Sequence, residues 1–211
     1  MRIERIVKKG RKDVTIYFDD DKYLILSVEV FLKSGLKKGD NVDEDRFSFL
    51  IEQNKLYHIK QKALRLLGRR QHSVFELRTK LWRKDYEQKL IDSVISDLKE
   101  NKYLNDEDFI LEFVAAKSKS KNWSLRRIIS ELIKRGISSK QIDSALKGQL
   151  IDSDKENVAG LAKKKYELLL KRGLDQNELK KRMYSYLLSK GFDYELVKTV
   201  CDKIIKSGTD E

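Results

Sequence analysis

Apolar residues recur with helical spacing in three segments of the chain, and these segments align with one another. Successive segments are offset by 51 and 55 residues, within or near the range of helical repeat architectures. In each segment two apolar residues lie four positions apart and a third follows five positions later: Leu77, Leu81 and Tyr86, then Ile128, Leu132 and Ile137, then Met183, Leu187 and Phe192. The pattern predicts three units, each with a helix, a tight turn and a second helix.

Residues suited to helix ends flank these apolar positions. Asp85, Gly136 and Gly191 occupy one aligned position, where a helix end needs a residue that tolerates a left-handed backbone. Capping boxes, in which two side chains satisfy unpaired backbone N–H groups, are predicted for Ser73 with Glu76, Ser138 with Gln141 and Asp175 with Glu178. The starts and stops of several helices are therefore encoded locally.

The first 57 residues have a different pattern, with short β-rich runs separated by polar turns. The runs Ile3–Val7, Val14–Phe18 and Tyr23–Leu26 predict a three-stranded antiparallel sheet. A short helix is expected from Val28 to Gly35, and one long helix from Asp43 to Leu67 leads into the first repeat. We place the domain boundary near Lys55, and the lack of a Gly-, Ser- or Pro-rich linker there predicts that the small domain packs against the helices.

Composition supports a mainly α fold, because the 211 residues include no proline. The beginning of the chain lacks the apolar run of a secretory signal, and no stretch is apolar enough to cross a membrane, so we expect a cytoplasmic location. Cys201 falls on the buried face of the last helix, which favours a small core residue over a reactive thiol. Tyr103 and Leu104 are also expected in the core.

Positive charge is concentrated in the repeats. Residues 1–57 contain 12 Lys or Arg against 11 Asp or Glu, whereas the remainder holds nearly all of the net charge of +12. A basic helical body favours polyanions, because phosphate contacts dominate nucleic-acid affinity. The alternative explanation for the positive charge needs no partner. In this explanation the chain is simply rich in Lys, which solvent-exposed helix faces favour. The paired arginines, Arg69–Arg70 and Arg126–Arg127, favour binding, since a guanidinium can engage phosphate or a partner's carboxylate through two hydrogen bonds.

Two tryptophans lie beside basic residues. Trp82 follows the core position Leu81 and is expected to be half exposed, so it suits either core packing or stacking against a partner. Trp123 precedes Ser124, where an apolar side chain can pack on the first turn of the next helix. Stacking on bases remains the alternative for Trp123.

Catalytic patterns are lacking. The two histidines, His58 and His72, have no partners at metal-ligand spacing, and Gly35–Asp40 lacks the Gly-Lys-Ser/Thr ending of a phosphate-binding loop. We therefore expect neither an enzyme nor a bound metal or cofactor.

Several motifs, in this order along the chain, resemble those of the RecX family of bacterial regulators of the RecA recombinase. They begin with Ala63–Leu67 and Arg69-Arg70-Gln-His-Ser73, and continue with Tyr103-Leu104-Asn105-Asp106, Ser124–Ile137, Lys181–Met183 and Lys190–Phe192. The segment from Met1 to Asp40 resembles the β-containing extension of longer members, and Asp85-Tyr86 departs from the family's usual Gly and aromatic. The resemblance implies an elongated array of three tandem three-helix repeats behind a small β-containing domain, with limits at 1–55, 56–105, 106–152 and 153–211.

The resemblance also implies the partners. Family members bind RecA and its filament on single- or double-stranded DNA and suppress filament growth, ATP hydrolysis, strand exchange and co-protease activity, in DNA repair and the SOS response. We expect a monomer without a membrane partner. Position and charge, rather than any family motif, select the predicted contacts: Arg69, Arg70, Arg83, Lys84, Lys119, Lys121, Arg126, Arg127, Lys164 and Lys165. The alternative function is a stand-alone DNA- or RNA-binding helical module.

Overall fold

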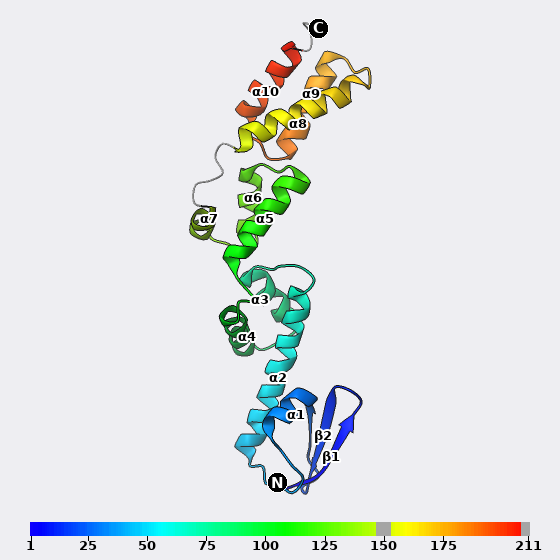
Figure 1. Ribbon diagram of the computed structural model, residues 1–211, viewed down its shortest axis with the longest axis vertical. Coiled ribbons are helices and arrows are strands. Elements are labelled where there is room, and N and C mark those ends of the chain that lie inside the picture. The colour runs from blue at the N-terminus through cyan, green and yellow to red at the C-terminus, as the bar shows by residue number, and fades with distance from the viewer. Residues whose placement is uncertain (147–152, 208–211) are drawn as a thin grey trace. The chain divides into compact units, whose positions relative to one another are not determined.

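A computed structural model describes residues 1–146 and 153–207 of the chain, apart from the side chains of Ser153 and Glu156 (Figure 1). Contacts within the chain divide it into two compact units, Met1–Leu104 and Asn105–Glu211. The described residues form one small sheet, and the rest of the regular structure is helical. The predicted mainly α fold with a β-containing N-terminal part is confirmed.

The first unit begins with the predicted three-stranded antiparallel sheet, in the order β1 (Ile3–Lys9), β2 (Asp13–Phe18) and β3 (Tyr23–Ser27). Alternate residues of β2, namely Val14, Ile16 and Phe18, point to one face and are buried. Two helices, α1 (Val28–Ser34) and α2 (Glu44–Leu67), contribute residues to the same apolar core. The short helix and the long helix that the sequence predicts are thus both present.

The free edge of β3 is covered by one side chain of α2. The amide of Asn54 accepts a hydrogen bond from the Ser27 N–H at 2.8 Å and donates one to the Ile25 carbonyl at 3.1 Å. These two bonds replace the partners that a fourth strand would supply. Asn54 therefore fixes α2 to the sheet by pairing with its backbone.

The same α2 helix continues into the first repeat with α3 (Val74–Trp82) and α4 (Gln88–Glu100), as Figure 1 shows. Ile59 and Ala63 of α2 pack with the predicted Leu77 and Leu81 of α3 and with Ile91 of α4, all fully buried. One helix thus contributes to two successive apolar cores.

The second unit contains two further three-helix groups, each with its own core. The first comprises α5 (Asp106–Lys121), α6 (Leu125–Ile133) and α7 (Ser139–Leu146). The second comprises α8 (Ser153–Leu170), α9 (Gln176–Ser189) and α10 (Tyr194–Ser207). The aligned residues Ile128, Leu132, Met183 and Leu187 are buried, as the repeat pattern predicts. The domain limits of the sequence analysis remain a prediction.

The predicted helix ends are also confirmed. Asp85, Gly136 and Gly191 have positive φ angles of 58°, 78° and 91°. Ser73 and Asp175 each accept a hydrogen bond from the backbone N–H three residues later. Ser138 and Gln141 form a reciprocal capping box, with side chain to backbone distances of 3.0 and 3.3 Å.

Two core expectations are confirmed and one is wrong. Leu104 and Cys201 are buried, whereas Tyr103 is 60% exposed. Lys102 adopts a left-handed backbone after α4, and both Tyr103 and Leu104 then donate their N–H groups to the Leu98 carbonyl. This tight turn directs the second of the two apolar residues into the core and leaves the first outside.

Candidate functional site: the junction of the second and third repeats

Four of the predicted contact residues gather where the second repeat meets the third. Lys121 ends α5, and Arg126 and Arg127 lie in the first turn of α6. Lys165 belongs to α8, and its ammonium lies 4.9 Å from the ring centroid of Tyr186 on α9. Lys190, which follows α9, lies 5.3 Å from the same ring and donates to the Lys121 carbonyl at 2.9 Å. Residues far apart in the sequence thus form one basic cluster.

Backbone contacts hold this junction together. The Ser124 N–H donates to the Lys190 carbonyl at 3.0 Å, which joins the start of α6 to the end of α9. The Leu125 N–H donates to both carboxylate oxygens of Asp154, each at 3.1 Å. Burial raises the pKa of Asp154, while the hydrogen bond from Leu125 opposes that rise. A carboxylate from the third repeat therefore caps a helix of the second.

Gly191 permits the close approach of the two repeats. Its φ angle is 91°, and a Cβ atom there would lie 2.6 Å from the Arg127 Cβ and 2.8 Å from the Ser124 Oγ. Both the backbone conformation and the space thus require glycine. The sequence predicts this glycine as a helix stop, and the structure adds a packing role.

Arg126 and Arg127 have different surroundings. The guanidinium of Arg127 stacks 4.3 Å from the centroid of the Trp123 ring and donates to the Ser189 carbonyl. The Arg126 side chain is 81% exposed, and its nearest described carboxylate is Asp193 at 3.8 Å. Arg126 is therefore available for a partner, whereas Arg127 joins the repeats.

Trp123 packs beside the core of the second repeat and carries Arg127 and Lys117 on its ring. This arrangement agrees with the structural interpretation of Trp123 as a residue that packs on the next helix. Stacking of a base on the side of the ring that Arg127 covers would displace the guanidinium.

In the first unit, Arg70 is also engaged within the chain. Its guanidinium donates to both carboxylate oxygens of Glu76, at 2.9 and 3.3 Å, and to the Gln71 carbonyl at 2.6 Å. Both terminal nitrogens of the Arg70 guanidinium are thus bound to a carboxylate of the same chain rather than to a partner. The remaining predicted contacts are exposed and form no ion pair among the described residues: Arg69, Arg83, Lys84, Lys119 and Lys164.

An exposed apolar residue recurs at one aligned position of all three repeats, directly after the buried Leu81, Leu132 and Leu187. The residues are Trp82, Ile133 and Leu188, with exposed fractions of 63%, 49% and 40%. Of the three, only Trp82 is singled out in the sequence by its residue type. Ile133 and Leu188 carry the same signal, because each is the apolar residue that follows the core leucine of its repeat.

Glu131 neutralises basic residues of the second repeat. Hydrogen bonds from Arg135 at 2.8 Å and Lys134 at 2.9 Å lower its pKa to about 2. Both cations are therefore held against α6 and are less suited to a partner than Arg126.

Other kinds of site find little support in the part of the chain that the structure describes. No group of three or more His, Cys, Asp or Glu side chains there is arranged to hold a metal ion. No helix within residues 1–146 or 153–207 is long and apolar enough to span a membrane.

Comparison with known proteins gives one consistent family. Models described as the first, second and third three-helix domains of RecX match residues 60–98, 105–146 and 152–201. A "Regulatory protein RecX" of Clostridium botulinum (strain Alaska E43 / Type E3) is 30% identical, over 92% of this chain and 91% of that protein. The protein of the same name from Clostridioides difficile (strain 630) is 29% identical, over 96% and 95% of the two chains.

Solved structures share the fold. The crystal structure of a regulatory protein RecX has a TM-score of 0.70 at 20% identity and covers 95% of this chain and 98% of its own. A RecX structure from Lactobacillus salivarius has a TM-score of 0.59 at 20% identity, covering 72% of this chain and 97% of its own. The first match extends over the N-terminal sheet as well as the repeats.

Proposed function

Because this chain belongs to the RecX family of regulatory proteins, we propose that it binds the RecA recombinase and its filament on DNA and inhibits recombination, ATP hydrolysis and co-protease activity. We propose further that it acts as a cytoplasmic, monomeric, non-enzymatic regulator in DNA repair and the SOS response. Such regulation needs affinity for the filament and no chemical step.

The basic cluster at the junction of the second and third repeats carries this proposal. Lys121, Arg126 and Lys165 come from three helices. Lys190 contacts the Lys121 carbonyl and shares the Tyr186 ring with Lys165, and Arg126 lies beside Asp193, two residues after Gly191. A filament on DNA presents phosphates, to which clustered cations bind through charge and counterion release. Contact there would compete with strand pairing or with addition of the next RecA subunit.

The exposed apolar residues of the repeats supply a second kind of contact. Trp82, Ile133 and Leu188 suit the protein component of the filament, because apolar and aromatic side chains dominate the energetics of protein interfaces. The basic cluster suits the DNA of such a filament, and the exposed apolar residues suit its protein.

The decisive experiment titrates the full chain into single-strand-dependent ATP hydrolysis by the cognate RecA. We expect hydrolysis to fall with increasing protein, and an Arg126→Glu variant to require a higher concentration for the same inhibition. Lys33→Glu is the matched control, because Lys33 is a cation of similar exposure, 76% against 81% for Arg126, and lies on α1, outside the cluster. Unaltered hydrolysis at every ratio of folded protein to RecA would refute the regulator.

A stand-alone nucleic-acid-binding module is the competing function, favoured by the net charge of +12. Its affinity for bare DNA would fall steeply with salt and would not change when RecA is added. Binding to DNA with and without RecA, across a salt series, distinguishes the two functions.

A further inference from the structure

One face of the N-terminal sheet points away from the apolar core that the sheet shares with α1 and α2. Cross-strand pairs place Arg5, Tyr17 and Tyr23 in one row on that face. The next row holds Val7, Thr15 and Ile25. Tyr23 is 61% exposed, and Ile25 and Val7 are 40% and 38% exposed. Antiparallel sheets commonly present polar residues to solvent, so the exposed apolar and aromatic side chains of this face are candidates for contact with a partner.

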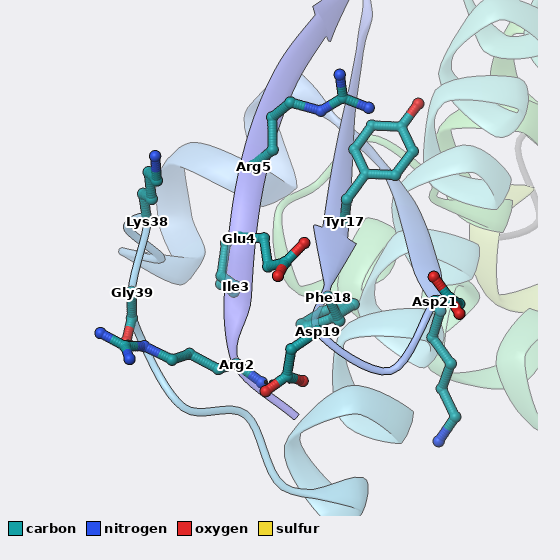
Figure 2. A pocket seen from close by; sticks show the side chains of 11 residues that line it. Arg2, Ile3, Glu4, Arg5, Tyr17, Phe18, Asp19, Asp21, Lys38 and Gly39 are labelled. Atoms are coloured by element: carbon teal, nitrogen blue, oxygen red, sulfur yellow. Dashed lines mark hydrogen bonds between the residues drawn. The ribbon is translucent and has the colours of Figure 1, made fainter.

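Two flat stacking positions lie side by side in the first row. The Arg5 and Tyr17 side chains lie beside one another (Figure 2), with the guanidinium 4.3 Å from the ring centroid. The neighbouring Tyr23 ring has no aromatic or cationic partner among the described residues. Aromatic rings and arginine planes on a sheet are surfaces on which unpaired bases stack.

Cations cluster at the end of the same sheet. The end of β1 carries Lys8 and Lys9, and the turn that follows it carries Arg11 and Lys12. All four are exposed and form no ion pair among the described residues. Asp13, the first residue of β2, is the single acid in the sequence from Lys8 to Asp13. These side chains can reach a phosphate backbone whose bases lie on the tyrosines.

The acidic residues lie at the opposite end of the sheet. A surface hollow of about 780 Å³ there is lined from several segments, among them Arg2, Asp19, Asp21 and Lys38. Figure 2 shows these side chains around the start of β1. Asp19 accepts the Arg2 N–H at 2.8 Å, and Asp20 pairs with Lys22 at 3.3 Å. Acidic and basic side chains are thus mixed at this end, whereas the hairpin end carries four cations and one acid.

We propose that this sheet face, formed by Tyr23 and the Arg5–Tyr17 stack and flanked by the hairpin cations, binds single-stranded DNA. Bases stack on the two flat positions, and Lys9 and Lys12 contact phosphates. A duplex does not fit, because its bases are already stacked on one another. The proposal goes beyond the regulatory role, and only the choice of DNA over RNA rests on that role.

The test uses the full chain without recombinase. An oligothymidylate of about 16 nucleotides, the upper end of the site size of comparable single-strand-binding domains, carries a fluorophore for anisotropy and a photoreactive base for crosslinking. We expect crosslinks within residues 1–27, and we expect Tyr23→Ala to abolish them and weaken binding roughly 5- to 150-fold. Tyr23→Phe keeps the ring and retains affinity.

Tyr103→Ala is the matched control, because Tyr103 is 60% exposed but lies outside the sheet. Crosslinks confined to the repeats, or equal loss of duplex binding in Tyr23→Ala, would overturn the proposal. Tighter binding of the corresponding oligouridylate would overturn the choice of DNA. RecA is not in the assay, so its result is independent of the ATP hydrolysis experiment.

Discussion

Arg127 lies over Trp123, with the guanidinium carbon 4.3 Å from the ring centroid, and thereby joins the second repeat to the third. We expect Arg127→Ala to lower the free energy of unfolding by roughly 1–3 kcal/mol, because a cation–π contact and a hydrogen bond to the Ser189 carbonyl are lost. Urea denaturation followed by circular dichroism measures the change.

Arg126→Ala is the control for this prediction. Its side chain is 81% exposed, so we expect a change within about 0.5 kcal/mol. Equal destabilisation by the two variants would contradict the division of roles between these neighbours.

Gly191→Ala is expected to destabilise the protein by roughly 1–3 kcal/mol. The new Cβ would lie 2.6 Å from the Arg127 Cβ, and the φ angle of 91° is unfavourable for alanine. Gly160→Ala on α8 is the matched control, because a Cβ there meets nothing within 4 Å and alanine favours a helix by roughly 0.5–1 kcal/mol. Thermal unfolding should shift in opposite directions for the two variants.

Sequence was a good guide wherever the deciding interactions are local. The capping box of Ser138 and Gln141 depends only on their spacing of three residues. The left-handed backbone at Asp85 depends on the ability of aspartate to adopt a positive φ angle. The expectation of a buried Tyr103 is wrong, because the left-handed backbone at Lys102 decides which of two adjacent apolar residues points inward.

The candidate site was less predictable. Arg126 and Arg127 look alike in sequence, yet a helix turns about 100° between adjacent residues and sends them to different surroundings. The partners of Arg127 and Ser124 across the junction, Ser189 and Lys190, lie more than 60 residues away. Pairing over that separation depends on how two repeats pack, which the spacing of apolar residues does not specify.

Glu131 predicts a loss of stability in acid. Its pKa is about 2 in the folded protein against 4.5 ordinarily, so the unfolded chain takes up the proton first. The stabilising contribution is complete above about pH 4.5 and is lost as the pH falls towards 2. We expect Glu131→Gln to flatten this dependence in unfolding measurements across the pH range.

Glu112→Gln is the control for Glu131, since Glu112 is an exposed carboxylate of the same repeat without a described ion pair. If the free energy of unfolding of Glu131→Gln falls with acid as steeply as that of the wild type, other carboxylates cause the loss of stability.

The Cys201 thiol is expected to be unreactive in the folded protein. Burial, followed by the nearby charge of Asp202, raises its pKa to about 11, so the neutral thiol prevails at pH 8. Because the unfolded thiol ionises first, its contribution to stability is lost between about pH 9 and 11. A thiol-specific chromogenic disulfide should react rapidly in urea and slowly in buffer; rapid reaction in both would place the thiol at the surface.

The exposed apolar residues that recur in the three repeats are expected to contribute affinity for RecA that does not fall with salt concentration. We expect the triple change Trp82→Ser, Ile133→Ser and Leu188→Ser to weaken inhibition of ATP hydrolysis while leaving binding to bare DNA and its salt dependence unchanged. These side chains are 40–63% exposed, so folding should be preserved. The change Leu32→Ser is the control, because Leu32 is 69% exposed but lies outside the repeats.

The number of residues in α2 sets the orientation of the N-terminal sheet relative to the first repeat. Asn54 holds it to β3, and Ile59, five residues later, anchors it in the core of the first repeat. Each residue inserted between them would turn the sheet by about 100° about the helix axis and move it by about 1.5 Å. Only insertions close to whole numbers of helical turns, such as about seven residues, would preserve the orientation of the sheet. Sequences related to this chain should therefore differ between Asn54 and Ile59 mainly by substitution.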